Sequence, residues 1–289
     1  AHYGEKPLGD ALVKWSIRDQ AGKELSCGSF QKPGLSFGCA IPLGEVRADL
    51  TKLPCPAAYQ LVVSLDDSTN DWNFWLYPPA EKSAAAQGVT VTRDFNECLK
   101  SLAAGGRVVY YPKPEDIAWD GPPLDRLPLF WNRLMSPGWS RMLGMWVDAK
   151  HPALAGFPTE DFADWQWLDV VGRSRTVNLG RLPAALKPIV QPVDDWNRNW
   201  KLGLIFEAKV GEGKLLVCAT DLTGDLSKSP AASALRASLL KYAASADFKP
   251  AVQVSPAQLG GMLSDTRIMA KLQARADGPA AAAIDGDPN

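Results

Sequence analysis

Two apolar runs separated by a glycine-containing turn dominate the second half of the chain. Residues 202–210 and 214–219 flank Gly211-Glu212-Gly213, and the second run is almost uninterrupted. Bulky and β-branched residues bounded by glycines predict a hairpin whose strands are covered on both faces. Pro230 then opens a predicted helix over 231–244, in which apolar residues recur at helical spacing. A hairpin followed by a helix that packs back on it is typical of the closing unit of an α/β domain.

A helix and several short strands are predicted upstream of this hairpin. Asp94 and Glu97 have the spacing of a capping box for a helix over 95–104, which Gly105-Gly106 ends. The apolar run over 107–112 follows as a short buried strand, an order typical of a βαβ fragment. Further strands are predicted over 143–147 and 188–193.

Residues 1–79 follow a different pattern, in which short strand-like runs are separated by turn residues without any helical stretch. Residues 13–17 and 59–65 alternate between apolar and polar side chains, and 73–78 supply a last strand. Short strands at this spacing predict an all-β domain, which we interpret as a small immunoglobulin-like sandwich.

The patterning therefore predicts two domains, an all-β immunoglobulin-like sandwich over 1–79 and an α/β domain over 89–250. The polar, Ala/Ser-rich stretch over 80–88 is the expected linker. Residues 251–289 are expected to hold a helix over 256–274 and a tail that we interpret as disordered from its Ala/Gly/Asp/Pro composition.

Charge and composition narrow the possible partners. The formal net charge of the chain is -1, whereas nucleic-acid-binding proteins typically carry an excess of basic residues. The sequence also contains no apolar run that approaches the roughly 20 residues needed to span a bilayer. We therefore expect neither nucleic acid nor a membrane as a partner. Five cysteines without a CxxC spacing indicate neither a disulfide framework nor a zinc site, and Cys98 and Cys218 are expected to be buried. The chain opens with Ala1, which we interpret as a processed chain or a piece of a longer protein.

Residues suited to catalysis are few. His2 and His151 are the only imidazoles, and neither a Gly-x-Ser-x-Gly motif nor a cysteine at a strand-to-helix elbow is present. Nucleophilic catalysis would therefore depend on His151, and a histidine-based metal site is excluded. We expect no cofactor. Carboxylates are numerous enough for a glycosidase pair, but sequence spacing does not place two of them across a cleft.

Eleven tryptophans are the compositional oddity, and several of them alternate with polar residues. Flat rings beside carboxylates and amides suit a sugar, because the ring covers C–H faces while the polar groups bind hydroxyls. The candidate carbohydrate-binding residues are Trp165, Trp167, Trp196, Trp200, Asp194, Arg198, Asn199, Glu207 and His151. The alternative is that these tryptophans fill the gap between the two domains and that the polar residues cap loops.

One motif covers residues 70–78, and later motifs lie at 130–132, 151–154, 157–160, 164–167 and 206–216. In their shared order over residues 10–250, these motifs resemble bacterial proteins related to family 2 glycoside hydrolases (β-galactosidase-like). Residues 70–78 resemble the end of a β-sandwich found late in those proteins. The region of the later motifs looks like a class I glutamine-amidotransferase-like (flavodoxin-like) domain, similar to one that mediates trimer formation in some other β-galactosidases.

The resemblance implies accessory domains rather than an active site. In such enzymes catalysis resides in a separate (β/α)8 barrel with two glutamates, and neither that barrel nor the amidotransferase Cys-His-Glu triad is matched here. We therefore expect a non-catalytic module of an extracellular or periplasmic glycoside hydrolase, with carbohydrate, the remainder of the hydrolase and further copies of the chain as partners. The alternatives are a glycoside hydrolase or esterase active on its own, using Glu207 or Asp194 with His151, and a purely structural oligomerisation domain.

Overall fold

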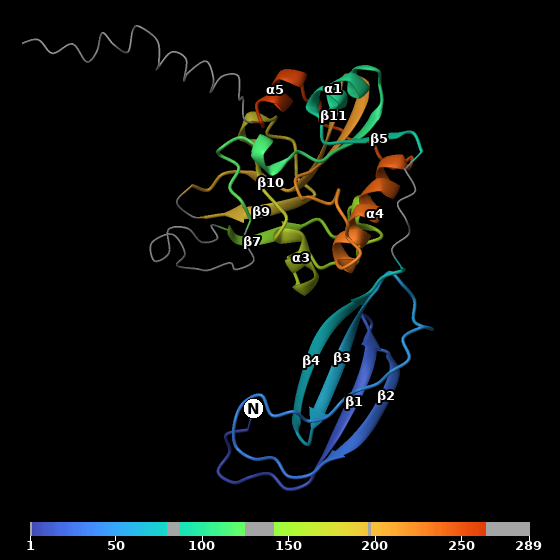
Figure 1. The fold of residues 1–289 in the computed structure, drawn as a ribbon, viewed down its shortest axis with the longest axis vertical. Coiled ribbons are helices and arrows are strands. Elements are labelled where there is room, and N and C mark those ends of the chain that lie inside the picture. Colours follow the sequence, from blue (N-terminus) through green and yellow to red (C-terminus); the bar gives the residue numbers. More distant parts are fainter. Residues whose placement is uncertain (1, 80–86, 125–141, 196–197, 264–289) are drawn as a thin grey trace, which may run out of the picture.

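The computed structural model describes residues 2–79, 87–124, 142–195 and 198–263, which form two domains (Figure 1). The N-terminal domain holds four antiparallel strands in one sheet of order β2-β1-β3-β4. The strands are β1 (Ala11–Asp19), β2 (Glu24–Lys32), β3 (Ala57–Leu65) and β4 (Ser68–Leu76). The prediction of an all-β N-terminal domain is confirmed.

One face of this sheet is apolar, as period-two alternation requires. The cross-strand pairs Val13–Leu65 and Tyr59–Phe74 place apolar side chains on that face, where Val13 and Tyr59 are buried. A sandwich has two sheets, whereas the described residues of this domain form one. Residues 33–56 are irregular and lie against the sheet, where the Tyr59 hydroxyl donates to the Pro54 carbonyl at 2.6 Å. Leu35 and Gly38 of this segment form only isolated bridges, with Leu8 and His2.

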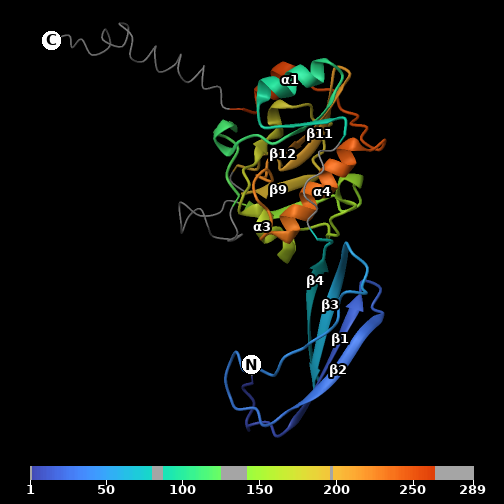
Figure 2. The same ribbon diagram turned by 45° about the vertical axis from the view of Figure 1, so that its right-hand side comes forward.

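The C-terminal domain is built on a mixed six-stranded sheet of order β5-β6-β12-β11-β9-β7. Strands β12, β11 and β9 of this sheet are labelled in Figure 2. Its strands are β5 (Val89–Thr92), β6 (Arg107–Tyr110), β7 (Met142–Val147), β9 (Val190–Asp194), β11 (Ile205–Val210) and β12 (Gly213–Cys218). Neighbours β5, β6 and β12 are parallel, whereas β11, β9 and β7 continue the sheet by antiparallel pairing. The small ladder of β8 (Val177–Asn178) and β10 (Leu202–Gly203) lies outside it. This domain is therefore α/β, as predicted.

Short helices cover and connect this sheet. The α-helices are α1 (Phe95–Ala103), α3 (Leu168–Val171), α4 (Pro230–Ala244) and α5 (Pro256–Gly260). Single 3-10 turns are η1 (Pro114–Asp116), η2 (Pro152–Leu154), η3 (Trp165–Trp167) and η4 (Leu179–Arg181). Helices α1 and α4 both pack on β6, whose Val108, Val109 and Tyr110 are buried.

The structure confirms α4 and the hairpin of β11 and β12, although residues 202–203 of the first predicted run pair with β8 instead. Two other helices differ in detail from the prediction. Asp94 caps α1 by accepting from the Glu97 N–H at 2.8 Å, but the Glu97 carboxylate accepts from the Thr92 hydroxyl instead of closing a capping box. The helix expected over 256–274 is shorter, because α5 ends at Gly260 beside a second glycine. Residues 264–289, including the expected tail, lie outside the described residues.

The two domains contact each other through the end of the N-terminal sheet. The Tyr77 ring stacks on Phe157 with 6.1 Å between centroids, and its hydroxyl donates to the Gln166 side-chain carbonyl. A groove of about 350 Å³ lies beside this junction, lined by the β1–β2 turn, residues 54–59 and Pro158. A tyrosine, rather than the predicted tryptophans, therefore makes the described ring contact between the domains.

Candidate functional site

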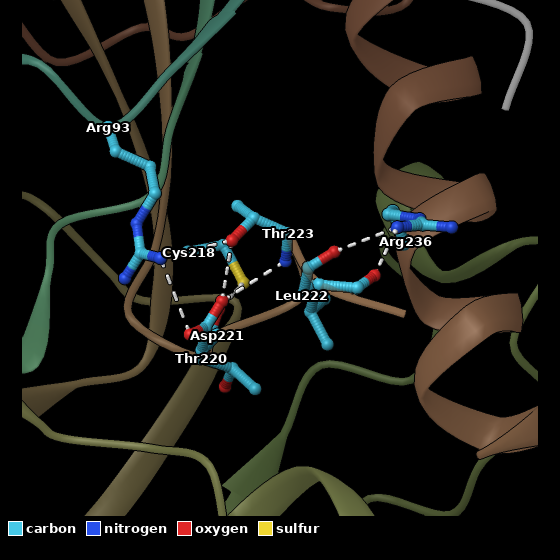
Figure 3. Close-up of polar contacts among 8 residues, drawn as sticks. Arg93, Cys218, Thr220, Asp221, Leu222, Thr223 and Arg236 are labelled. Atoms are coloured by element: carbon cyan, nitrogen blue, oxygen red, sulfur yellow. Dashed lines mark hydrogen bonds and ion pairs between the residues drawn. The ribbon is translucent and has the colours of Figure 1, made fainter. Parts of the chain in front are cut away.

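The carboxyl ends of β5, β6 and β12 form the edge where open α/β sheets usually bind ligands. Here internal contacts occupy this edge (Figure 3). The Asp221 carboxylate accepts from the Thr223 N–H at 3.1 Å and from the Thr223 hydroxyl at 2.7 Å. Arg93 forms an ion pair with Asp221 at 3.4 Å and donates to the Thr223 hydroxyl at 3.1 Å. Burial raises the pKa of Asp221, but these bonds outweigh it, so the pKa lies below its ordinary value.

The thiol at this edge is unsuited to nucleophilic attack. Cys218 ends β12 and is fully buried, and burial raises the pKa of its thiol to about 12. Such a thiol is protonated at neutral pH and is inert. Arg236 of α4 donates to the Leu222 and Gly224 carbonyls at 3.2 Å each, which fixes the loop after β12 (Figure 3). Among the described residues, this edge is ordered and presents no activated nucleophile.

A second polar cluster joins two residues that the sequence singled out. The Tyr242 hydroxyl donates to the Glu207 carboxylate at 2.6 Å, and its ring packs edge-on against His151 with 5.3 Å between centroids. His151 Nδ1 accepts from the Ala153 N–H at 3.2 Å, so the proton of the neutral ring lies on Nε2. Burial lowers the pKa of His151 and favours this neutral form. The cluster joins η2, β11 and α4 and ties the helix to the sheet.

Metal ligands do not gather in the part of the chain that the structure describes. Within those ranges no group of three or more His, Cys, Asp or Glu residues is placed to hold a metal ion. The described helices also include none long and apolar enough to cross a bilayer.

The loop after β9 is held by a network of buried charges. Asp194 and Asp195 have side chains only 1% and 3% exposed, and Arg198, 14% exposed, forms ion pairs with both. The second Asp194 oxygen accepts from the Trp200 N–H at 3.0 Å. Asn199 adopts φ of 51°, which Asn tolerates better than most residues. Both carboxylates are thus used to fix the backbone and the guanidinium in one arrangement.

Two tryptophans and this guanidinium form an aromatic corner, in which Trp119 is exposed and Trp200 is partly buried. The Arg198 Cζ lies 5.1 Å from the centre of the Trp200 ring, and the Trp119 ring meets Trp200 edge-on with 6.2 Å between centroids. Trp119 is 79% exposed, although its neighbours Ala118 and Asp120 are buried. We use the name aromatic corner for Trp119, Trp200 and Arg198.

The turn that carries Trp119 is anchored on both sides. The Ala118 N–H donates to the Met262 carbonyl at 3.1 Å, and Asp120 forms an ion pair with Arg181 at 2.7 Å. Asn178 also donates to Asp120, at 3.2 Å. An exposed indole on a fixed turn loses little conformational freedom when a ligand packs on it.

The structure separates the predicted carbohydrate-binding residues. Asp194 ends β9, and Arg198, Asn199 and Trp200 lie beside it in the loop that follows, whereas Glu207 and His151 lie in the Tyr242 cluster. Trp165 is 75% exposed on η3, next to Gln166 of the domain junction. Trp196 lies outside the described residues.

Trp167 differs from Trp165 because it does not lie at the surface. Its side chain is wholly buried, its ring packs edge-on against Phe157, and its Nε1 donates to the Thr159 hydroxyl at 2.9 Å. A 3-10 turn explains the difference from Trp165, because at three residues per turn positions i and i+2 point in different directions.

Comparisons with known protein families agree with the division into two domains. Residues 90–264 match a family described as a domain of unknown function, DUF8487, which covers more than half of the chain. The chain belongs to the DUF8487 family. Residues 1–78 match a second domain of unknown function, DUF8488, and no curated protein matches the chain. The match over 1–78 contains the four-stranded sheet of this DUF8487 member, and the match over 90–264 contains nearly all of its six-stranded sheet.

Trp119 was not among the carbohydrate-binding residues predicted from the sequence. Residue 119 is about 80 positions from Trp200, and only the folded chain places the two rings together. The turn-forming pair Asp120-Gly121 beside Trp119 is a local signal of a turn, but the residues around it are largely buried, so only the structure shows that Trp119 is exposed.

Proposed function

We propose that this chain is a non-catalytic accessory part of a larger glycoside hydrolase and that its aromatic corner binds carbohydrate. The observation that carries the proposal is the exposed Trp119 ring, held on an anchored turn beside Trp200 and the fixed Arg198. Large exposed rings on rigid supports are typical of interaction sites. The motifs that resemble family 2 glycoside hydrolases suggest the parent class and an extracellular or periplasmic location.

The chemistry of the corner favours a sugar as the ligand. Indole faces cover the C–H surface of a pyranose, while guanidinium N–H groups donate to hydroxyls. Arg198 is already oriented by Asp194 and Asp195, so binding would not have to order it. The two carboxylates are nearly buried and paired with this arginine, which makes them unsuitable as an acid–base pair across a sugar.

Each domain also has features of a known fold. We infer that the N-terminal sheet is related to immunoglobulin-like sandwiches and the second domain to flavodoxin-like amidotransferase domains. The parallel β5–α1–β6 unit next to β12 supports the second relationship. The antiparallel continuation through β11, β9 and β7 is where the sheet departs from an all-parallel flavodoxin-like order.

Affinity electrophoresis tests carbohydrate binding directly. The intact chain is run through gels containing a panel of soluble β-linked polysaccharides, beside the variants Trp119→Ala and Trp72→Ala. Trp72 is 50% exposed on the N-terminal sheet and serves as the matched aromatic control. We expect retardation by at least one polysaccharide, loss of retardation in Trp119→Ala and normal retardation in Trp72→Ala. Equal mobility in every gel would contradict carbohydrate binding.

An independent hydrolase is the second candidate, because the structure brings His151 and Glu207 to the same tyrosine. This candidate predicts activity of the chain on aryl glycosides or aryl esters, abolished by Glu207→Gln. Without that activity the cluster is a structural tie between α4 and the sheet.

Light scattering tests the oligomerisation proposal on the same sample, where a stable dimer or trimer without sugar affinity would favour a purely structural role.

A further inference from the structure

We propose that strand β4 pairs with the β4 strand of a second copy of the chain, so that two N-terminal sheets join into one continuous sheet. This interaction surface is separate from the aromatic corner, and the inference does not depend on carbohydrate binding. It follows from the edge that β4 presents and from the order of its side chains.

Strand β4 forms one edge of the N-terminal sheet, and its outer side is open. It pairs with β3 over residues 68–76, and among the described residues no other strand or bridge pairs with it. Residues 68–73 are all exposed, and Figure 1 shows β4 as the outermost strand of the sheet. The backbone N–H and C=O groups that point away from β3 are therefore available to another strand.

The sequence of β4 lacks the features that usually protect an exposed edge. Such edges are typically short, bulged or covered, or they carry proline and lysine. Strand β4 is nine residues long, contains neither proline nor lysine, and pairs with β3 without a register shift. An uncovered strand of this kind is a template for the addition of a further strand.

The other edges of the described sheets are each short, bulged or covered. Strand β2 has a register shift between Glu24 and Ser26. Strand β5 is only four residues long, and β8 and β10 have two residues each. Strand β7 is covered by residues 161–163, through a bond from the Val147 N–H to the Asp161 carbonyl at 2.9 Å. Strand addition is therefore expected at β4.

The side chains of β4 favour a second copy of the same strand as the partner. Asp71 is the only charged residue of β4, and Gln60 Nε2 donates to its carboxylate at 2.6 Å. In antiparallel pairing about a two-fold axis at Asn70, each Asp71 faces the Thr69 of the other copy. The Thr69 hydroxyl can donate to that carboxylate, so the one charged residue of each strand faces a donor rather than another charge.

Charge and burial along β4 select this axis among the alternatives. An axis at Asp71 would set two carboxylates directly opposite each other, which is destabilising. An axis at Trp72 would extend the pairing to residues 74–76, which are half-buried where β4 meets η3. The axis at Asn70 pairs residues 68–72 only, and all of these are exposed.

Backbone hydrogen bonds supply most of the affinity in strand addition. Truncation of one side chain, as in Trp72→Ala, therefore leaves the pairing groups in place, whereas a second carboxylate opposite Asp71 opposes the pairing. Thr69→Asp introduces that carboxylate, and Thr69→Asn is the neutral control of matching shape. Addition of Asp71→Asn to Thr69→Asp restores one carboxylate per strand and the wild-type net charge.

Sedimentation velocity of the intact chain over a range of concentrations tests the inference, after circular dichroism has confirmed that each variant is folded. We expect a concentration-dependent dimer in the wild-type chain and in Thr69→Asn. Thr69→Asp should raise the concentration of half-dimerisation by at least about tenfold, and the double variant should return it toward the wild-type value. Hydrogen exchange should become slower in β4, but not in β2, as the dimer forms.

The possible results separate this pairing from carbohydrate binding. A chain that stays monomeric at every concentration would overturn the pairing, as would a dimer that Thr69→Asp leaves unchanged or one without slower exchange in β4. The exchange measurement needs only the wild-type chain, so it decides the question even if a variant does not fold. Failure to bind carbohydrate would overturn the proposed function alone, because the aromatic corner lies in the other domain.

Discussion

Replacement of Arg198 by methionine tests whether buried charges hold the aromatic corner in place. Arg198 is paired with two carboxylates whose side chains are 1% and 3% exposed. Methionine fills much of the same volume but leaves both carboxylates without a counter-charge. Breaking a buried ion pair by removal of one partner costs about 3–5 kcal/mol, and loss of the cation–π contact with Trp200 adds about 0.5–1 kcal/mol. We expect the free energy of unfolding of the C-terminal domain to fall by about 3.5–6 kcal/mol.

Urea denaturation followed by tryptophan fluorescence measures this change. Arg47→Met is the matched control, because Arg47 pairs with Glu45 at 2.9 Å on the surface, with side chains 85% and 73% exposed. Exposed pairs of this kind contribute about 0–1 kcal/mol, so the control should unfold almost as the wild type does. Addition of Asp195→Asn to Arg198→Met should restore part of the loss. Equal destabilisation by Arg198→Met and Arg47→Met would refute the reasoning.

Three further outcomes test other parts of the structure. Burial raises the pKa of Asp164 to about 6, so the folded state binds the Asp164 proton more tightly than the unfolded state does. The protonated carboxyl therefore adds to the free energy of unfolding below about pH 4, and this contribution is lost as the pH rises through about 6. Because Asp164 is only half-buried, we expect a loss of about 1 kcal/mol in urea titrations across this window, absent in Asp164→Asn. Cys98 and Cys218 should react with a thiol reagent only after denaturation, since burial raises both pKa values to about 12; rapid labelling of either in the native chain would contradict their placement. Leu216→Ala, at a wholly buried position of β12, should cost about 2–5 kcal/mol by chemical denaturation, and a loss below 1 kcal/mol would show that β12 is not central.

The sequence correctly predicted the helices and strands whose determining residues lie within a few positions of one another. The hairpin of β11 and β12 follows from two apolar runs around Gly211-Glu212, where Gly211 adopts φ of 58°. Helix α4 follows from Pro230 and its apolar spacing, and α1 from its Asp94 cap. These signals depend on backbone preferences and burial that act within one element.

The features that escaped prediction depend on contacts between distant segments. The aromatic corner requires Trp119 and Trp200 to meet, and the burial of Trp167 depends on Phe157 and on the 3-10 geometry of η3. Alternation along β1–β4 predicted strands but does not specify whether a second sheet covers them. The sequence likewise indicates polar residues near Trp200 without showing that their charges are internally paired.

Sugar binding at the aromatic corner is the central claim. It is measured most directly by calorimetric titration of the intact chain with the polysaccharide that retards it most strongly. The account predicts a saturable heat that disappears in Trp119→Ala and persists in Trp72→Ala, with no new reducing ends in the recovered ligand. Heat that is unchanged in Trp119→Ala, or cleavage of the ligand by the chain alone, would contradict it.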